Sequence, residues 1–300
     1  MFLQPPLLQP GDTVALVSTA RKISREEIAP AITVLEGWGL KVKVGATIGA
    51  ESYQFAGDDS LRLRDFQQFI DDPDVRAVVC SRGGYGTVRI MDGIDWTGFL
   101  QSPKWIVGYS DITFLHIHLN QSLGVQTIHG SMPVNFPTNT AAAMDSLKQA
   151  LFSGAGSFEA DRHPLNRLGN ASGSLIGGNL SILYSITGTR SGFNTDGKIL
   201  VLEDLDEYYY HLDRMMMNLK RSGKLDRLAA LVVGGMTDMK DNAVPFGKSA
   251  EEIILDAVKE FNYPVVFGMP FGHIPDNRTL LLGKRYHLQA LATGTLFGSV

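Results

Sequence analysis

Ser110 lies just beyond an apolar run, residues 105–107, where the sequence passes into a stretch with helical spacing. Gly108, two residues earlier, relieves crowding at such a turn. A sharp strand-to-helix turn lifts a hydroxyl clear of the sheet and sets helix N-terminal N–H groups beside it, which suits a nucleophile. The hydrolase form of this turn has a second glycine where this chain has Ile112. The segment alone favours a simpler interpretation, in which Ser110 or Asp111 caps the helix.

A glycine-rich loop follows a second apolar run, residues 76–80. Its glycines, Gly83, Gly84 and Gly86, do not match the G-x-G-x-x-G or P-loop spacing, which disfavours a nucleotide. At the carboxyl end of a strand, such a loop can offer a backbone N–H to a tetrahedral intermediate at a serine on the neighbouring strand. We therefore predict an oxyanion hole here, and a plain tight turn is the alternative.

Two carboxylates and a histidine are candidates for an acid and a base. Glu203 and Asp204 end an apolar run, and only one of them can point into a given pocket because adjacent strand residues face opposite sides. His273 lies in a loop constrained by glycines and prolines. Any one histidine is more often a surface or packing residue than a base, so the loop position alone does not single out His273. His129 is a comparable candidate.

Metal and thiol chemistry are weaker interpretations. His116 and His118 are two residues apart on a predicted helix and do not share a face, and the sequence contains no H-E-x-x-H or paired-cysteine pattern. Cys80 closes an apolar strand, where burial would raise the pKa of its thiol. We predict that the protein needs neither a metal nor a cofactor.

Strands and helices must alternate in the first half to position these residues. Short β-branched runs alternate with amphipathic stretches, which is typical of βαβ units around a mostly parallel sheet. The segments are 13–17, 24–38, 42–44, 60–71, 75–80, 105–107 and 125–128. The predicted fold class is therefore α/β, with a doubly wound N-terminal domain over residues 1–152 that is flavodoxin-like or glutamine-amidotransferase-like.

The second half predicts a smaller mixed α/β domain, residues 174–300, with a swivelling β-rich core. Residues 153–173 are rich in glycine, serine and asparagine without sustained periodicity, which indicates a linker. Ser110 and the glycine loop fall in the first domain, whereas Glu203 and His273 fall in the second. The site is therefore expected to assemble at the domain interface.

Composition narrows the classes of partner. The net charge is −4 and the 27 lysines and arginines are scattered, which disfavours nucleic acid and favours a small molecule or peptide. No stretch approaches the roughly 18 apolar residues of a membrane span, and the N-terminus lacks a basic, apolar leader. The single cysteine, Cys80, excludes an internal disulfide and fits a reducing compartment. We expect a cytoplasmic protein that does not bind membranes.

Taken together, these motifs resemble one family, the LD-carboxypeptidases of bacterial murein recycling, over nearly the whole chain. Their order and spacing carry the resemblance: Gly11-Asp12, Arg82-Gly-Gly-Tyr-Gly with Arg89, Gly108-Tyr-Ser-Asp, His129-Gly, Gly177-Gly-Asn-Leu-Ser, Leu202-Glu-Asp with Glu207 and Asp213-Arg214, and Phe271-Gly-His. It implies a metal-independent serine peptidase that removes terminal D-alanine from murein tetrapeptide, and a homodimer.

The resemblance also implies a role for each site residue. Ser110 would be the nucleophile, His273 the general base and Glu203 the carboxylate that orients it. The oxyanion hole would use backbone N–H groups of Gly84 and Asp111. The residues expected near the peptide are Arg82, Tyr85 and Asn179.

Two departures from the family pattern concern the pocket rim. The first strand ends Ser18-Thr19-Ala20 where the family usually has a Pro-Ser pair, and Ser131 replaces a proline after His129-Gly130.

Three alternative functions stay open. The first is an immunity-type peptidase of the same family that cleaves acyl-adenylate-like antibiotics. The second is a nucleotide-dependent oxidoreductase module, and the third is a non-catalytic two-lobe binding protein.

Overall fold

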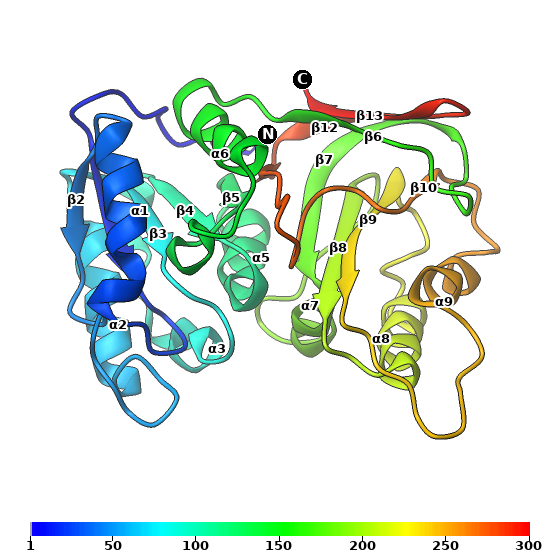
Figure 1. Cartoon of the computed structure of the whole chain (residues 1–300), viewed down its shortest axis with the longest axis horizontal. Coiled ribbons are helices and arrows are strands. Elements are labelled where there is room, and N and C mark those ends of the chain that lie inside the picture. The colour runs from blue at the N-terminus through cyan, green and yellow to red at the C-terminus, as the bar shows by residue number, and fades with distance from the viewer. Residues whose placement is uncertain (1) are drawn as a thin grey trace.

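The computed structural model describes residues 2–300, which form two β-sheets lying side by side (Figure 1). The six-stranded first sheet has the order β11-β5-β4-β3-β1-β2 and is parallel except for β11. Its strands are β1 (Thr13–Val17), β2 (Lys41–Val44), β3 (Val75–Cys80), β4 (Trp105–Gly108), β5 (Thr127–His129) and β11 (Leu280–Leu282).

Helices cover both faces of this sheet. Along β3, Val78 and Cys80 belong to one hydrophobic cluster, and the alternate residues Ala77 and Val79 belong to another. A parallel strand buried on both faces is the expected result of helical crossovers, and the predicted doubly wound α/β fold is confirmed. The helical segments are α1 (Arg25–Gly37), α2 (Asp59–Asp71), α3 (Thr87–Ile90), η1 (Met91–Gly93), α4 (Thr97–Gln101), η2 (Ser110–Ile112), α5 (Thr113–Ser122), η3 (Pro133–Asn135) and α6 (Ala141–Ser153).

The seven-stranded second sheet is mixed, with the order β10-β9-β8-β7-β12-β13-β6. Strands β7 to β10 are parallel, and the remaining strands pair antiparallel. Its elements are β6 (Ser157–Ala160), β7 (Gly169–Asn179), α7 (Leu180–Ile186), β8 (Ile199–Leu205), α8 (Tyr209–Arg221), β9 (Ala230–Thr237), α9 (Ala250–Ala257), β10 (Val265–Val266), β12 (Arg285–Leu291) and β13 (Gly294–Ser299). The predicted mixed second half is confirmed.

Residues 153–173, expected to be a linker, contain β6 and the first part of β7. Both segments pair with strands more than 100 residues away, β13 and β12. Local composition could not reveal these strands because distant partners hold them. Strand β11 likewise returns from the second half to pair with β5 of the first sheet. The division of the chain at residues 152 and 174 stays a prediction.

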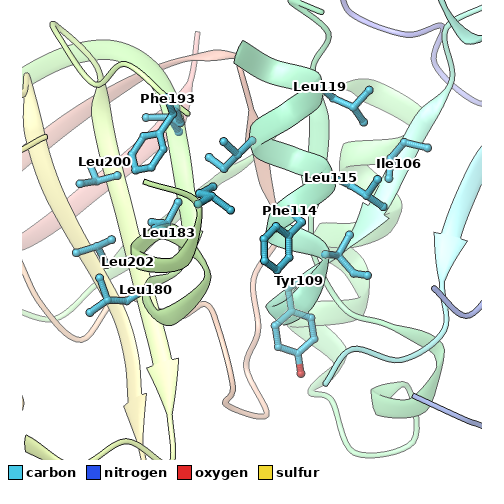
Figure 2. Packing of buried hydrophobic residues seen from close by; sticks show 14 of the residues in the cluster. Ile106, Tyr109, Phe114, Leu115, Leu119, Leu180, Leu183, Phe193, Leu200 and Leu202 are labelled. Carbon is cyan, nitrogen blue, oxygen red and sulfur yellow. The ribbon is translucent and has the colours of Figure 1, made fainter. Parts of the chain in front are cut away.

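The two lobes share one hydrophobic cluster, in which α5 of the first lobe packs against α7 of the second. This cluster runs from Ile106 on β4 through Phe114 on α5 to Leu183 on α7 and Leu202 on β8 (Figure 2). Truncating a buried leucine to alanine costs about 2–5 kcal/mol. The cluster therefore fixes the lobes and the cavity between them. Within residues 2–300, no helix is long and apolar enough to cross a bilayer.

Candidate active site

Ser110 begins η2 directly beyond the end of β4 and adopts φ +62°, a left-handed conformation that is costly for any residue except glycine. Gly108 is required nearby, since a Cβ there would lie 2.8 Å from Ile112 Cγ1. The isoleucine that breaks the hydrolase pattern thus packs on Gly108. Ser110 therefore lies on a strained strand-to-helix elbow, as the sequence predicts.

The helix-cap interpretation of this turn is wrong. Neither η2 nor α5 has a side-chain capping hydrogen bond. The Asp111 carboxylate instead accepts a hydrogen bond of 2.9 Å from the Thr87 N–H, across the turn in a different helix. The Ser110 hydroxyl is left facing a cavity between the lobes.

The glycine loop lies against Ser110. A Cβ on Gly83 would come within 3.1 Å of Ser110 Cβ and 3.2 Å of Ser110 Oγ. Gly84 adopts φ +106°, and its N–H donates to no acceptor within residues 2–300. Asp111 is the second residue of η2, so its N–H has no intrahelical partner. Both backbone donors proposed for the oxyanion hole line the cavity.

Arg62 holds this loop in place from beneath. Its fully buried guanidinium donates to Thr19 O at 2.7 Å and to Gly86 O at 2.9 Å, and it pairs with Asp59. A Cβ on Gly86 would lie 2.6 Å from Arg62 Nη1. Sequence reasoning missed Arg62, because a long-range bond to a carbonyl leaves no local pattern.

Glu203 on β8 and His273 in the loop after β10 form a close pair. His273 Nδ1 lies 2.6 Å from Glu203 Oε2, and the Glu203 side chain is fully buried. Burial alone would raise the pKa of Glu203, but the charge of His273 and its hydrogen bond outweigh it, and the pKa lies below its usual value. Burial would lower the pKa of His273, but the Glu203 carboxylate raises it above 6.5. Asp204 instead accepts hydrogen bonds from Asn179 and Ser181.

His129, the other candidate base, has no carboxylate partner. It is completely buried between the Tyr109 and Phe271 rings, at centroid distances of 5.7 and 6.0 Å. Neither ring nitrogen has a hydrogen-bond partner within residues 2–300, and burial lowers its pKa to about 4. His129 therefore stays neutral behind the cavity, whereas His273 faces it.

Gly272 makes room for Glu203. It adopts φ +101°, and a Cβ there would lie 2.7 Å from Glu203 Cβ. We expect Gly272→Ala to displace the carboxylate, lower kcat/KM at least tenfold and destabilise the protein by about 1–3 kcal/mol.

Gly268 is the matched control, because it adopts φ +69° in the same loop and a Cβ there would meet nothing within 4 Å. Gly268→Ala should carry only the backbone cost, about 1 kcal/mol. Peptidase assays and urea unfolding of both variants measure the difference. Equal activity loss in the two variants would contradict the steric role of Gly272.

The cavity between the lobes, of 460 Å³, brings most of the predicted site residues together. Ser110, Asp111, Gly84, Arg82, Asn179 and His273 line it, and Glu203 lies behind His273. The ring of Tyr109, next to the serine, lies 4.8 Å from the His273 ring between centroids. Sequence reasoning missed Arg21 and Asp206, and it named Glu207 only as part of a family motif; all three line the same cavity.

Two predicted peptide-binding residues differ from expectation, Tyr85 in its position and Asn179 in its contacts. Tyr85 does not line this cavity; it tilts against Phe55 and faces a neighbouring cleft of 700 Å³. The Asn179 amide reaches the cavity, but it caps α7 at Ile182 N and donates to Asp204 Oδ1 at 2.9 Å. Tyr85 therefore lines the neighbouring cleft, and Asn179 has a structural task at this cavity.

The remaining chemical candidates are inert in this fold. Cys80 is buried, and burial raises the pKa of its thiol to about 12. Within residues 2–300, no three histidine, cysteine, aspartate or glutamate side chains converge as a metal site would require. Ser110 and His273 line the cavity, and Glu203 lies behind the imidazole.

Comparison with known families and proteins agrees with the geometry. Residues 14–130 match a family model described as the LD-carboxypeptidase N-terminal domain, and residues 172–288 match the LD-carboxypeptidase C-terminal domain. The chain is 35% identical over 291 residues to a probable murein peptide carboxypeptidase of Bacillus subtilis, covering 94% of this chain and 90% of that protein. It is 33% identical over 289 residues to the murein tetrapeptide carboxypeptidase of Pseudomonas aeruginosa, covering 92% and 93%.

Solved structures share the fold. A muramoyltetrapeptide carboxypeptidase from Oxalobacter formigenes superposes with a TM-score of 0.88 at 28% identity, covering 96% of this chain and 98% of that one. The self-immunity protein MccF, in complex with glutamyl sulfamoyl guanosine, superposes with a TM-score of 0.87 at 20% identity, covering 100% and 98%. The second likeness concerns the fold alone.

Proposed function

Because this chain belongs to the LD-carboxypeptidase family, we propose that it is a serine carboxypeptidase that releases terminal D-alanine from murein tetrapeptide. The observation that carries the proposal is the buried Glu203–His273 pair, with 2.6 Å between Oε2 and Nδ1, at a cavity that Ser110 also lines. A carboxylate that orients an imidazole beside a serine is the arrangement that activates a hydroxyl for acyl transfer. The chemistry needs no metal.

In this mechanism Ser110 Oγ attacks the carbonyl that joins an L-configured centre to D-alanine, and His273 Nε2 takes the hydroxyl proton. Backbone N–H groups of Gly84 and Asp111 stabilise the oxyanion, each contributing on the order of 3 kcal/mol. Collapse of the tetrahedral intermediate breaks the C–N bond, and His273 returns the proton to the leaving amine of D-alanine. Water, activated by His273, then hydrolyses the acyl-enzyme. Glu203 holds the imidazole tautomer throughout.

Arg82 lines the cavity and is a candidate contact for the peptide backbone or side chains. The Ser110 elbow and the glycine loop belong to the first lobe, Glu203 lies on β8 of the second, and His273 lies in the loop that connects β10 of the second sheet to β11 of the first. Activity therefore depends on how the lobes pack. A homodimer stays a prediction from the family resemblance, and a cytoplasmic location stays a prediction from the composition of the chain.

The second candidate is an immunity-type peptidase that cleaves acyl-adenylate-like antibiotics. The fold shared with MccF favours it as the alternative. The family resemblance associates that activity with longer chains that carry an additional aromatic loop, and the sequence shows no such insertion. We therefore rank it second.

A panel of three substrates separates these functions. Mass spectrometry should detect D-alanine and tripeptide from murein tetrapeptide, no product from tripeptide, and little from an acyl-sulfamoyl-adenylate. The rate should be the same with and without a chelator such as EDTA. Cleavage of the adenylate alone would favour the immunity function, no cleavage of any substrate would favour a binding protein, and loss of activity with EDTA would contradict a metal-independent mechanism.

A further inference from the structure

The cavity has walls of opposite charge. On the first-lobe wall are two guanidinium groups, Arg21 and Arg82. On the second-lobe wall are three carboxyl groups, Asp204, Asp206 and Glu207. Two of these carboxyl groups have partners, since Asp206 pairs with Lys240 and Glu207 with His211, and burial raises the pKa of Asp204 to about 7. This wall nevertheless offers no arginine or lysine to a terminal carboxylate, so we expect a peptide to place that end toward the two guanidinium groups of the first lobe.

Of the two cations, Arg21 is the one without a partner. Arg82 Nη1 lies 3.4 Å from the Glu27 carboxylate and 3.4 Å from the Lys22 carbonyl. No carboxylate within residues 2–300 forms a salt bridge with Arg21, and its side chain donates no hydrogen bond there. Arg21 is thus available for a ligand.

Three contacts fix the backbone of Arg21 at the cavity. Ser18 Oγ donates to Arg21 O at 2.6 Å, Arg21 N lies 3.4 Å from Gly83 O, and Arg21 forms an antiparallel bridge with Phe55. The Ser18 hydroxyl comes from the segment where this chain departs from the family pattern. Ser18, which belongs to the departure from the family pattern, therefore helps to position Arg21 in the cavity wall.

The stem of Arg21 lies directly on the glycine loop. A Cβ on Gly84 would lie 2.1 Å from Arg21 Cδ, so only glycine leaves room for that side chain. The preceding residue, Gly83, contacts Ser110. The nucleophile and the arginine therefore approach the cavity over neighbouring residues of one loop, and neighbouring Cα atoms are about 3.8 Å apart.

We propose that Arg21 binds the terminal carboxylate of the substrate and thereby restricts the enzyme to carboxy-terminal residues. The inference rests on the proposed function. In a peptide cleaved one residue from its end, the terminal carboxylate lies one residue beyond the scissile carbonyl, and here Ser110 packs on Gly83 while Arg21 packs on the adjacent Gly84. A guanidinium binds a carboxylate through two parallel N–H···O bonds, which favours an acid over an amide of the same shape.

The test compares murein tetrapeptide with the same peptide bearing a terminal amide, both in the full-length enzyme. Wild type should cleave the acid at least 30-fold faster in kcat/KM. Arg21→Gln should lower kcat/KM for the acid by roughly 30- to 100-fold, mainly through KM, and reduce the preference for the acid to within about threefold. Arg21→Lys should keep only part of the wild-type preference for the acid.

Two further variants make the result specific. Arg25→Gln removes an exposed arginine on α1 that does not line the cavity. It should change kcat/KM for neither substrate by more than about twofold. Loss of the acid preference in Arg82→Gln with the preference retained in Arg21→Gln would overturn the proposal, as would equal loss on both substrates in Arg21→Gln. A wild type that cleaves neither peptide would instead refute the proposed function.

Discussion

Replacing Ser110 with alanine should abolish turnover of murein tetrapeptide, with kcat falling on the order of 10⁵- to 10⁶-fold and the fold intact. The variant removes the attacking oxygen. It does not change the backbone strain at this position, because alanine at φ +62° carries the same strain as serine. Substrate should still bind, since the cavity walls are unchanged. Single-turnover kinetics and calorimetric titration with the tetrapeptide measure the two effects separately.

The proposed action of Ser110 and His273 as nucleophile and base leads to a sharper expectation. If the two act as one unit, Ser110→Ala and His273→Ala should each cost about as much as the double variant, because either change alone removes the activated hydroxyl. Ser153→Ala, an exposed serine at the end of α6, is the control and should retain wild-type activity. Additive losses, or full activity in either single variant, would refute the nucleophile–base assignment.

Local sequence was sufficient to predict the elbow. A buried strand, a glycine two residues before a serine, and a helix after it constrain the backbone within ten residues. What local sequence could not decide was whether Ser110 caps that helix, since the answer depends on Asp111 turning to Thr87 in another helix. Likewise, the role of Ile112 follows from its contact with Gly108 rather than from any motif.

Long-range pairing explains what the sequence left unpredicted. Strand β6 looked like a linker because only its pairing with β13, more than 100 residues away, makes it a strand. Arg21 gave no signal because three separate segments, at Ser18, Phe55 and Gly83, bring it to the cavity. Tyr85 was misplaced because one loop can present neighbouring side chains to different cavities, and its turn geometry selects between them.

Glu203→Gln should lower kcat on the order of 10⁴-fold while preserving the size of the side chain. The carboxylate accepts the hydrogen bond of His273 Nδ1 at 2.6 Å from a fully buried position. A glutamine there can present its amide N–H₂ to Nδ1 instead, which selects the tautomer with its proton on Nε2 and leaves no acceptor for the serine proton. Glu36→Gln, an exposed glutamate on α1, is the control and should change nothing.

The pH dependence of the same variant tests the electrostatic part of the mechanism. The base must be neutral to accept a proton, so kcat/KM rises as pH passes the pKa of His273. In the wild type burial opposes protonation, but the Glu203 charge wins and holds that pKa above 6.5. In Glu203→Gln the burial of His273, which lowers its pKa, is opposed by the smaller effect of the Asp204 charge, so the pKa should fall below its wild-type value and the acid limb of the residual activity should move to lower pH. Profiles between about pH 4.5 and 9 for both proteins give the shift, and an acid limb that does not move would mean that Glu203 does not set the charge state of His273.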